Sequence, residues 1–72
     1  MYEVSLYQRG GKQGGKQFAF SVFATSETAQ RFAAQGGEEC QAQIVNTLSG
    51  ETVTYSVVAG QLTETKRYVI NN

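Results

Sequence analysis

The chain has no histidine, proline, tryptophan or aspartate, and Cys40 is its only cysteine. Without histidine and aspartate, general acid–base catalysis would depend on glutamates alone, so we expect a protein that is not an enzyme. One cysteine forms no internal disulfide, whereas small secreted domains usually carry several, so we expect a reducing, cytoplasmic setting. No apolar run approaches the roughly 20 residues of a membrane span, and residues 1–4 lack a signal-peptide pattern.

The residue types that carry catalysis or bind metals have no suitable partners in this sequence. Cys40 lacks a histidine to activate it as a nucleophile, and it lacks further cysteines with which to bind zinc. We expect it to be a small buried apolar residue. Glu38 and Glu39 are adjacent on a predicted loop, so their carboxylates should point apart. The sequence therefore predicts no catalytic residues, no metal and no cofactor.

The length and the charge favour a contact surface over a deep substrate site. Residues 1–72 are expected to form a single domain, and a chain this short has little interior to spare for a cavity. Six basic residues balance six acidic ones, which argues against a dedicated DNA-binding domain, because such domains are usually strongly basic. Basic residues predominate in residues 1–37 and acidic residues in residues 38–72.

Alternation of apolar and polar residues predicts two pairs of β-strands. Residues 2–8 and 17–24 form the first pair, and the glycines between them supply the positive φ angles that a hairpin needs. Residues 41–48 and 51–58 form the second pair, joined by a two-residue turn at Ser49–Gly50.

A helix is predicted between the two strand pairs. It begins at Thr25 or Ser26, whose hydroxyl can accept a hydrogen bond from a free N–H of the first turn. Its apolar stripe is narrow and centred on Phe32, and Gly36–Gly37 ends it. The alternative is one helix from Ser26 to about Leu48, which would place two glycines in its interior at about 1 kcal/mol each.

A short last strand is predicted at residues 66–70, with Tyr68 and Ile70 pointing inward. The expected fold is α+β: an antiparallel sheet of four to five strands with one helix packed on one face, in the order β-β-α-β-β(-β). Without proline the sheet edges lack one common guard against further pairing, so a homodimer joined through sheet edges stays open. The expected core consists of Val4, Leu6, Phe18, Phe20, Val22, Phe32, Ile44, Val53, Tyr55 and Val57.

The tetrapeptide Gly-Gly-Lys-Gln occurs twice in succession at residues 10–17. This predicted hairpin tip carries three positive charges, from Arg9, Lys12 and Lys16. A P-loop would need serine or threonine after the lysine and then a helix. Gln17 and a predicted strand follow instead, so a nucleotide site is not expected. The segment is either a solvated hairpin tip or a contact loop for protein or nucleic acid.

Two aromatic residues, Tyr7 and Phe23, fall on the strand faces opposite the predicted core. Beside Arg9 they are placed to stack on bases or to form a protein-binding patch, unless they pack under a loop or against the last strand. Lys66 and Arg67 add positive charge on that last strand. The predicted partner-binding residues are Tyr7, Arg9, Lys12, Lys16, Phe23, Lys66 and Arg67.

The small size, the order of elements and the helix-entry stretch ATSETAQRFAAQ (residues 24–35) resemble those of small phage-encoded inhibitors. Among these are anti-CRISPR proteins that act on type I surveillance complexes. The resemblance spans nearly the whole chain and assigns a function to no single residue. It implies a non-enzymatic inhibitor that docks on a host nucleoprotein complex and blocks nucleic-acid access, with the basic loop and the aromatic edge contacting the target.

Two functions are therefore predicted. The first is a protein-binding inhibitor or adaptor, favoured by the balanced charge and the glutamine-rich composition. The second is a small nucleic-acid-binding module that uses the basic glycine-rich loop and the sheet aromatics, and that binds single strands in a salt-sensitive way. Neither function involves a membrane.

Overall fold

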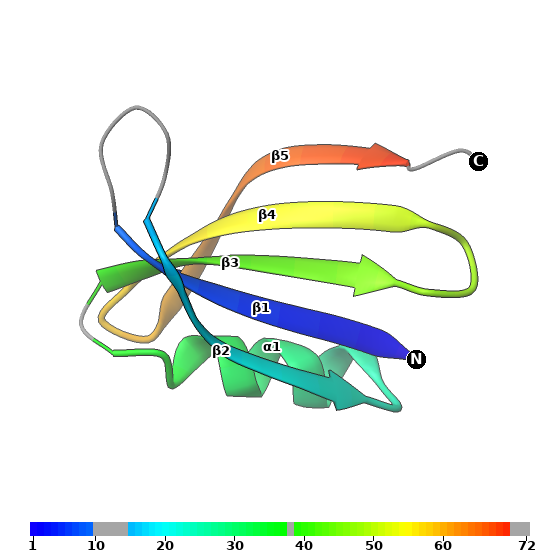
Figure 1. Cartoon of the computed structure of the whole chain (residues 1–72), viewed down its shortest axis with the longest axis horizontal. Helices are drawn as coiled ribbons and strands as arrows, with labels where there is room; N and C mark the ends of the chain where they lie inside the picture. The colour runs from blue at the N-terminus through cyan, green and yellow to red at the C-terminus, as the bar shows by residue number, and fades with distance from the viewer. Residues whose placement is uncertain (10–14, 38, 70–72) are drawn as a thin grey trace.

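The computed structural model describes residues 1–9, 15–37 and 39–69, and in these it confirms the predicted α+β fold. An antiparallel five-stranded sheet carries one helix (Figure 1). The alternative of one long helix to Leu48 is wrong, because the chain re-enters the sheet at Glu39. The elements are β1 (Tyr2–Gln8), β2 (Gln17–Phe23), α1 (Ser26–Ala34), β3 (Glu39–Asn46), β4 (Glu51–Val58) and β5 (Gln61–Val69).

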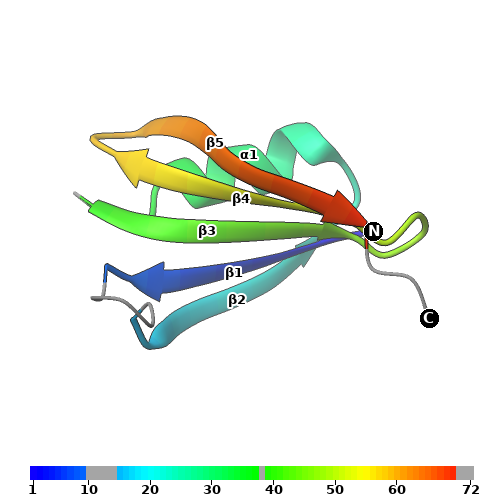
Figure 2. The same cartoon turned by 90° about the horizontal axis from the view of Figure 1, so that it is seen from above.

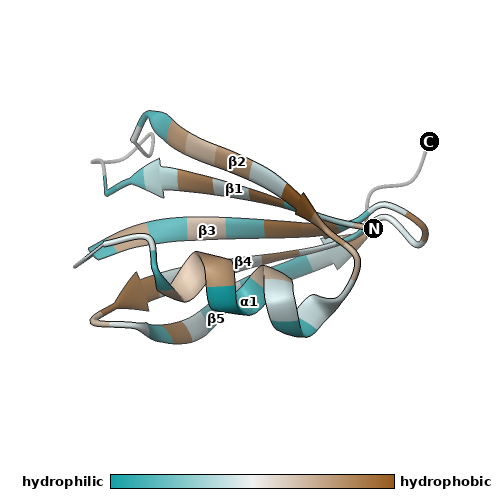
Figure 3. Ribbon diagram, turned by 90° about the horizontal axis from the view of Figure 1, so that it is seen from below, coloured by the Kyte–Doolittle hydropathy of each residue, from teal (hydrophilic) through white to brown (hydrophobic). Residues whose placement is uncertain are grey.

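The strands lie in the order β2-β1-β3-β4-β5, and every neighbouring pair is antiparallel. Strand β1 therefore lies between β2 and β3. The helix α1 connects β2, at the edge of the sheet, to β3, its central strand, and so crosses over β1. Figure 3 shows α1 lying across one face of the sheet. Figure 2 shows the other face, with the helix behind the strands. In the described part of the chain, then, one face is covered by a helix and the other is open.

The helix begins and ends where its sequence predicts. Thr25 has an extended backbone, and its hydroxyl accepts a hydrogen bond of 3.2 Å from the N–H of Thr28. The chain leaves the helix through Gly36 and Gly37, and Gly37 has a φ of 118°. At Gly36 a Cβ atom would lie 2.8 Å from the Cys40 sulfur, so glycine allows the helix end to approach the sheet closely.

Two turns differ from the sequence-based expectation. The β3–β4 connection runs from Thr47 to Gly50 and is longer than a two-residue turn, so Leu48 is 93% exposed instead of belonging to the strand. Ala59 and Gly60 both have positive φ, as the two central residues of a tight hairpin turn do. That turn leads directly into β5, which begins at Gln61 and is therefore longer than the predicted strand at residues 66–70.

The core lies between α1 and the covered face of the sheet. Five of the predicted core residues are buried, while Phe32 and Tyr55 are partly buried against them. Burial raises the pKa of the Cys40 thiol, in keeping with the prediction that this residue is a buried apolar one. The buried hydrophobic residues are Val4, Leu6, Ala29, Ala33, Cys40, Ala42, Ile44, Val53 and Val57.

The predicted orientation of β2 is wrong. Phe18, Phe20 and Val22 are 45%, 53% and 41% exposed, whereas Ala19 and Phe23 pack against the core. A one-residue bulge is the physical reason. Tyr7 pairs with Gln17 and Leu6 pairs with Ala19, so Phe18 is an extra residue.

Without this bulge the register would place Phe20 beside Val4 on the covered face, as the alternation predicts. The extra residue shifts the register by one and turns every later side chain of β2 to the other face. Phe20 therefore pairs with Ser5, and Ser21 pairs with Val4.

Candidate binding surface

The face of the sheet away from α1, here called the open face, is built from cross-strand rows of side chains. One row runs through Val22, Glu3, Val45, Thr52 and Tyr68, because each of these residues pairs directly with the next. Although Thr52 lies on the open face, between Val45 and Tyr68, it is fully buried. The second row runs through Phe20, Ser5, Gln43, Thr54 and Lys66.

A chain of hydrogen bonds ties the middle of the open face together. The hydroxyl of Tyr7 donates to Oε1 of Gln43 across 3.5 Å, and Nε2 of Gln43 donates to the hydroxyl of Tyr68 across 3.0 Å. These contacts connect β1, β3 and β5. The ammonium of Lys66 lies 5.2 Å from the centre of the Tyr68 ring, within the range of a cation–π interaction. The open face is thus an ordered polar and aromatic surface.

Tyr7 lies opposite the core, as the alternation of β1 predicts, and Lys66, predicted only as a basic residue of the last strand, shares this face. Nothing in the sequence singles out Gln43, and the sequence-based prediction placed Tyr68 inward. A second bulge explains the error at Tyr68. Lys66 pairs with Thr54 and Glu64 pairs with Tyr55, so Thr65 is an extra residue in β5. Its hydroxyl donates to the carbonyl of Thr54 across 3.2 Å. The extra residue turns Tyr68, 37% exposed, to the open face.

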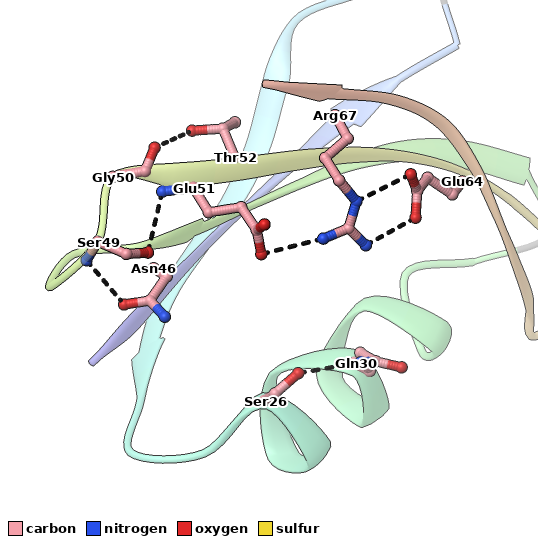
Figure 4. Close-up of polar contacts among 9 residues, drawn as sticks. All are labelled: Ser26, Gln30, Asn46, Ser49, Gly50, Glu51, Thr52, Glu64 and Arg67. Atoms are coloured by element: carbon pink, nitrogen blue, oxygen red, sulfur yellow. Dashed lines mark hydrogen bonds and ion pairs between the residues drawn. The ribbon is translucent and has the colours of Figure 1, made fainter. Parts of the chain in front are cut away.

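Arg67 lies on the covered face, away from Lys66, because it pairs with Val53. Its guanidinium contacts the carboxylates of Glu51 at 3.0 Å and Glu64 at 2.8 Å (Figure 4). These contacts raise the pKa of Arg67, and its hydrogen bond lowers the pKa of Glu64. Arg67 and Lys66, both among the predicted partner-binding residues, therefore lie on opposite faces of the sheet.

Phe23 also lies on the covered face, where its ring packs against Phe32 of α1 at a centroid distance of 5.2 Å and an angle of 45°. The prediction that Phe23 lies opposite the core is wrong, for the same reason as at Phe20: the bulge at Phe18. The structure therefore separates Tyr7 from Phe23, the two aromatic residues that the sequence places together.

The basic hairpin is described only at its base. Arg9 forms an ion pair with Glu39, and the N–H of Gln8 donates to the carbonyl of Lys16 across 2.9 Å. Lys16 is exposed. The predictions for Lys12 and for the rest of residues 10–14 lie outside the described residues.

A polar cavity of about 190 Å³ lies between α1 and the β4–β5 part of the covered face. Ser26 and Gln30 line it from the helix, and Tyr55 and Arg67 line it from the sheet. Figure 4 shows Ser26 and Gln30 on the helix and Arg67 on β5. Desolvation raises the pKa of Tyr55, although the charge of Arg67 opposes the shift. Within the described ranges, no three His, Cys, Asp or Glu residues are grouped so as to hold a metal ion.

In the part of the chain that the structure describes, no helix is long and apolar enough to cross a membrane. No protein-family model, curated protein or solved structure matches the chain.

Proposed function

We propose that this chain is a non-enzymatic binding protein, an inhibitor or adaptor, which docks its open face on a protein partner. The observation that supports the proposal most directly is the hydrogen-bonded line of Tyr7, Gln43 and Tyr68 across a sheet face that α1 does not cover. Tyrosine and phenylalanine are enriched at protein–protein interfaces, and here the apolar side chains of Phe20 and Val22 extend the surface to the edge of the sheet.

The pairing of charges favours a protein partner. Arg9, Arg31 and Arg67 each form an ion pair with a glutamate of the same chain. A guanidinium that is already paired contributes less to the attraction of phosphate groups, which dominates binding to nucleic acids. The chain has no net charge, so short-range complementarity, and not long-range steering, would select the partner.

The resemblance to phage-encoded inhibitors suggests which partner to test first. It makes a multi-subunit host nucleoprotein complex in the cytoplasm the first candidate, and the blocked step would be nucleic-acid access. In this proposal the open face provides the docking surface, and the basic hairpin at residues 9–17 reaches toward the nucleic-acid path.

The test compares two double variants in affinity capture from a bacterial lysate. Tyr7→Ala with Tyr68→Ala removes the aromatic groups of the open face. Arg31→Ala with Gln35→Ala, on the exposed side of the helix, is the matched control. Circular dichroism establishes that both variants are folded, and mass spectrometry quantifies the captured proteins.

We expect the wild type and the control to retain the same partner. The open-face variant should retain at least about tenfold less of it, as expected for the loss of aromatic interface residues. If no protein survives washing with the wild type, or if the open-face variant retains the partner fully, the proposal is wrong.

The second candidate, a single-strand-binding module, is favoured by one observation: Tyr7 and Tyr68 share the open face with Lys66, whose ammonium lies over the Tyr68 ring. Aromatic side chains on a sheet can stack on bases in this way. Fluorescence anisotropy with a labelled oligothymidine strand at low salt tests it. Binding that weakens with salt and with Lys12→Ser and Lys16→Ser would support this function, and undetectable binding would dismiss it.

A further inference from the structure

Strand β2 is an edge strand with almost none of the usual guards against pairing. Among the described residues, it pairs with β1 on one side only. Residues 17–26 contain no charged side chain, and the chain has no proline. Edge strands usually carry charges, prolines or bulges that discourage a further strand from adding to the sheet. The bulge of β2 lies at Phe18, near the start of the strand, so Ala19–Phe23 is a regular stretch with an open edge.

The side chains of this stretch favour pairing with an identical strand. Phe20 and Val22 point to the open face and are about half exposed, while Ala19 and Phe23 point to the covered face. The stretch is centred on Ser21. Antiparallel pairing about a two-fold axis through Ser21 would set Phe20 beside Val22 of the second copy, twice by symmetry. Pairs of an aromatic and a β-branched residue are among the favourable cross-strand neighbours.

The charges that flank β2 support the same arrangement. Lys16 precedes the strand, and Glu27, which also pairs with Arg31 at 2.9 Å, follows it in the first turn of α1. Antiparallel pairing brings the Lys16 end of one strand to the Glu27 end of the other, so that unlike charges meet at both ends. A parallel arrangement would instead bring like charges together.

We propose that a second copy of this chain pairs with β2 edge to edge, so that the two sheets become one continuous antiparallel sheet. The contact is closed by its two-fold symmetry and stops at a dimer. The two open faces then lie side by side, which doubles the docking surface without a new contact. The proposal does not depend on the proposed function, because it rests on the edge and side chains of β2 and not on a partner protein docked on the open face.

The oligomeric state in solution is the first test. Light scattering over a series of concentrations should give the mass of a dimer for the wild type. Phe20→Lys places like charges near the two-fold axis and should weaken the dimer by at least about tenfold. Thr63→Lys introduces the same charge on the other edge, at an exposed position of β5, and should leave the dimer unchanged.

A cross-link tests the register and covers the case in which Phe20→Lys does not fold. In a Cys40→Ala background, Ser21→Cys should form a covalent dimer on mild oxidation, because the two copies of residue 21 face each other at the axis. Thr63→Cys in the same background should not.

A wild type that stays monomeric at all concentrations would overturn the proposal. The edge of β2 would then be free to pair only with a strand of a different protein. A dimer lost only with Thr63→Lys would place the contact at β5, and assemblies larger than a dimer would contradict the closed symmetry. Each of these results rejects pairing through β2.

Discussion

The two edge strands of the sheet, β2 and β5, differ in the side chains that they expose to solvent. In the part of the chain that the structure describes, both β2 and β5 pair on one side only, and each contains a one-residue bulge that turns the side chains beyond it to the opposite face. In β2 the bulge turns Phe20 and Val22 outward, which leaves an apolar edge. In β5 the bulge turns Arg67 to the covered face, where it pairs with two carboxylates.

This difference shows that a bulge does not by itself protect an edge. The bulge of β5 lies within the strand, among charged residues, so both the irregular backbone and the charges of Glu64 and Lys66 oppose an added strand. The bulge of β2 lies at its start and leaves an uncharged stretch behind it. Protection depends on where the extra residue lies and on which side chains it turns outward.

The largest effect is expected from the aromatic residues of β2. Phe23→Ala removes a ring that packs on Phe32, and we expect a loss of about 2 kcal/mol in the free energy of unfolding. Phe20→Ala removes a half-exposed ring from the same strand and should cost less than about 1 kcal/mol. Urea unfolding, at a protein concentration low enough that the protein is monomeric, measures the loss of stability in both variants.

The two substitutions delete the same atoms from one strand, so each serves as the control for the other. A larger loss for Phe20→Ala than for Phe23→Ala would show that β2 has the opposite facing and that the bulge at Phe18 is absent.

An intermediate effect is expected at Thr25, which joins the end of β2 to the covering helix. Thr25→Ala removes the side-chain acceptor for the N–H of Thr28 and should lower the free energy of unfolding by about 1 kcal/mol. Thr25→Ser keeps the hydroxyl and is the matched control. Thermal unfolding followed by circular dichroism distinguishes them, and equal losses in the two variants would mean that the cap does not stabilise the helix.

The smallest effect is expected at Glu64 in β5. Its hydrogen bond with Arg67 lowers the pKa of the carboxyl, so the ion pair stabilises the folded state fully above the ordinary carboxyl pKa of about 4. This contribution disappears as the pH falls through the lowered value. Because the pair is exposed to solvent and salt, its contribution should be small.

The measurement is urea unfolding of the wild type and Glu64→Gln at neutral pH and at about pH 2. The wild type should be slightly more stable at neutral pH, and the difference should vanish in acid. A difference that persists at the lower pH would assign the effect of the substitution to packing and not to the ion pair.

Much of the fold could be predicted from local patterns. Thr25 and the glycines at 36 and 37 mark the ends of the helix, and alternation marks the first four strands. The predictions failed at the two edges. Alternation predicts which face of the sheet each side chain occupies only while the strand contains no bulge. No residue pattern around Phe18 or Thr65 marks either bulge.

The candidate surface was predicted only in part for the same reason. Tyr7 lies in the unbroken strand β1, and its facing was predicted correctly. Gln43 was overlooked because a single glutamine in a strand has no distinctive pattern. Its role follows from lying between Tyr7 and Tyr68, which are 36 and 25 residues away in the sequence.

The sequence by itself determined where the first four strands lie and where the helix begins, because these depend on contacts between residues close in the chain. It favoured an end of the helix at Gly36 and Gly37, while the length of β5 was not determined. It also determined the balance of charge and the absence of histidine and aspartate. Only the tertiary structure decided which side of β2 and β5 faces the helix. That choice follows from pairing between distant strands, where one extra residue reverses every side chain beyond it.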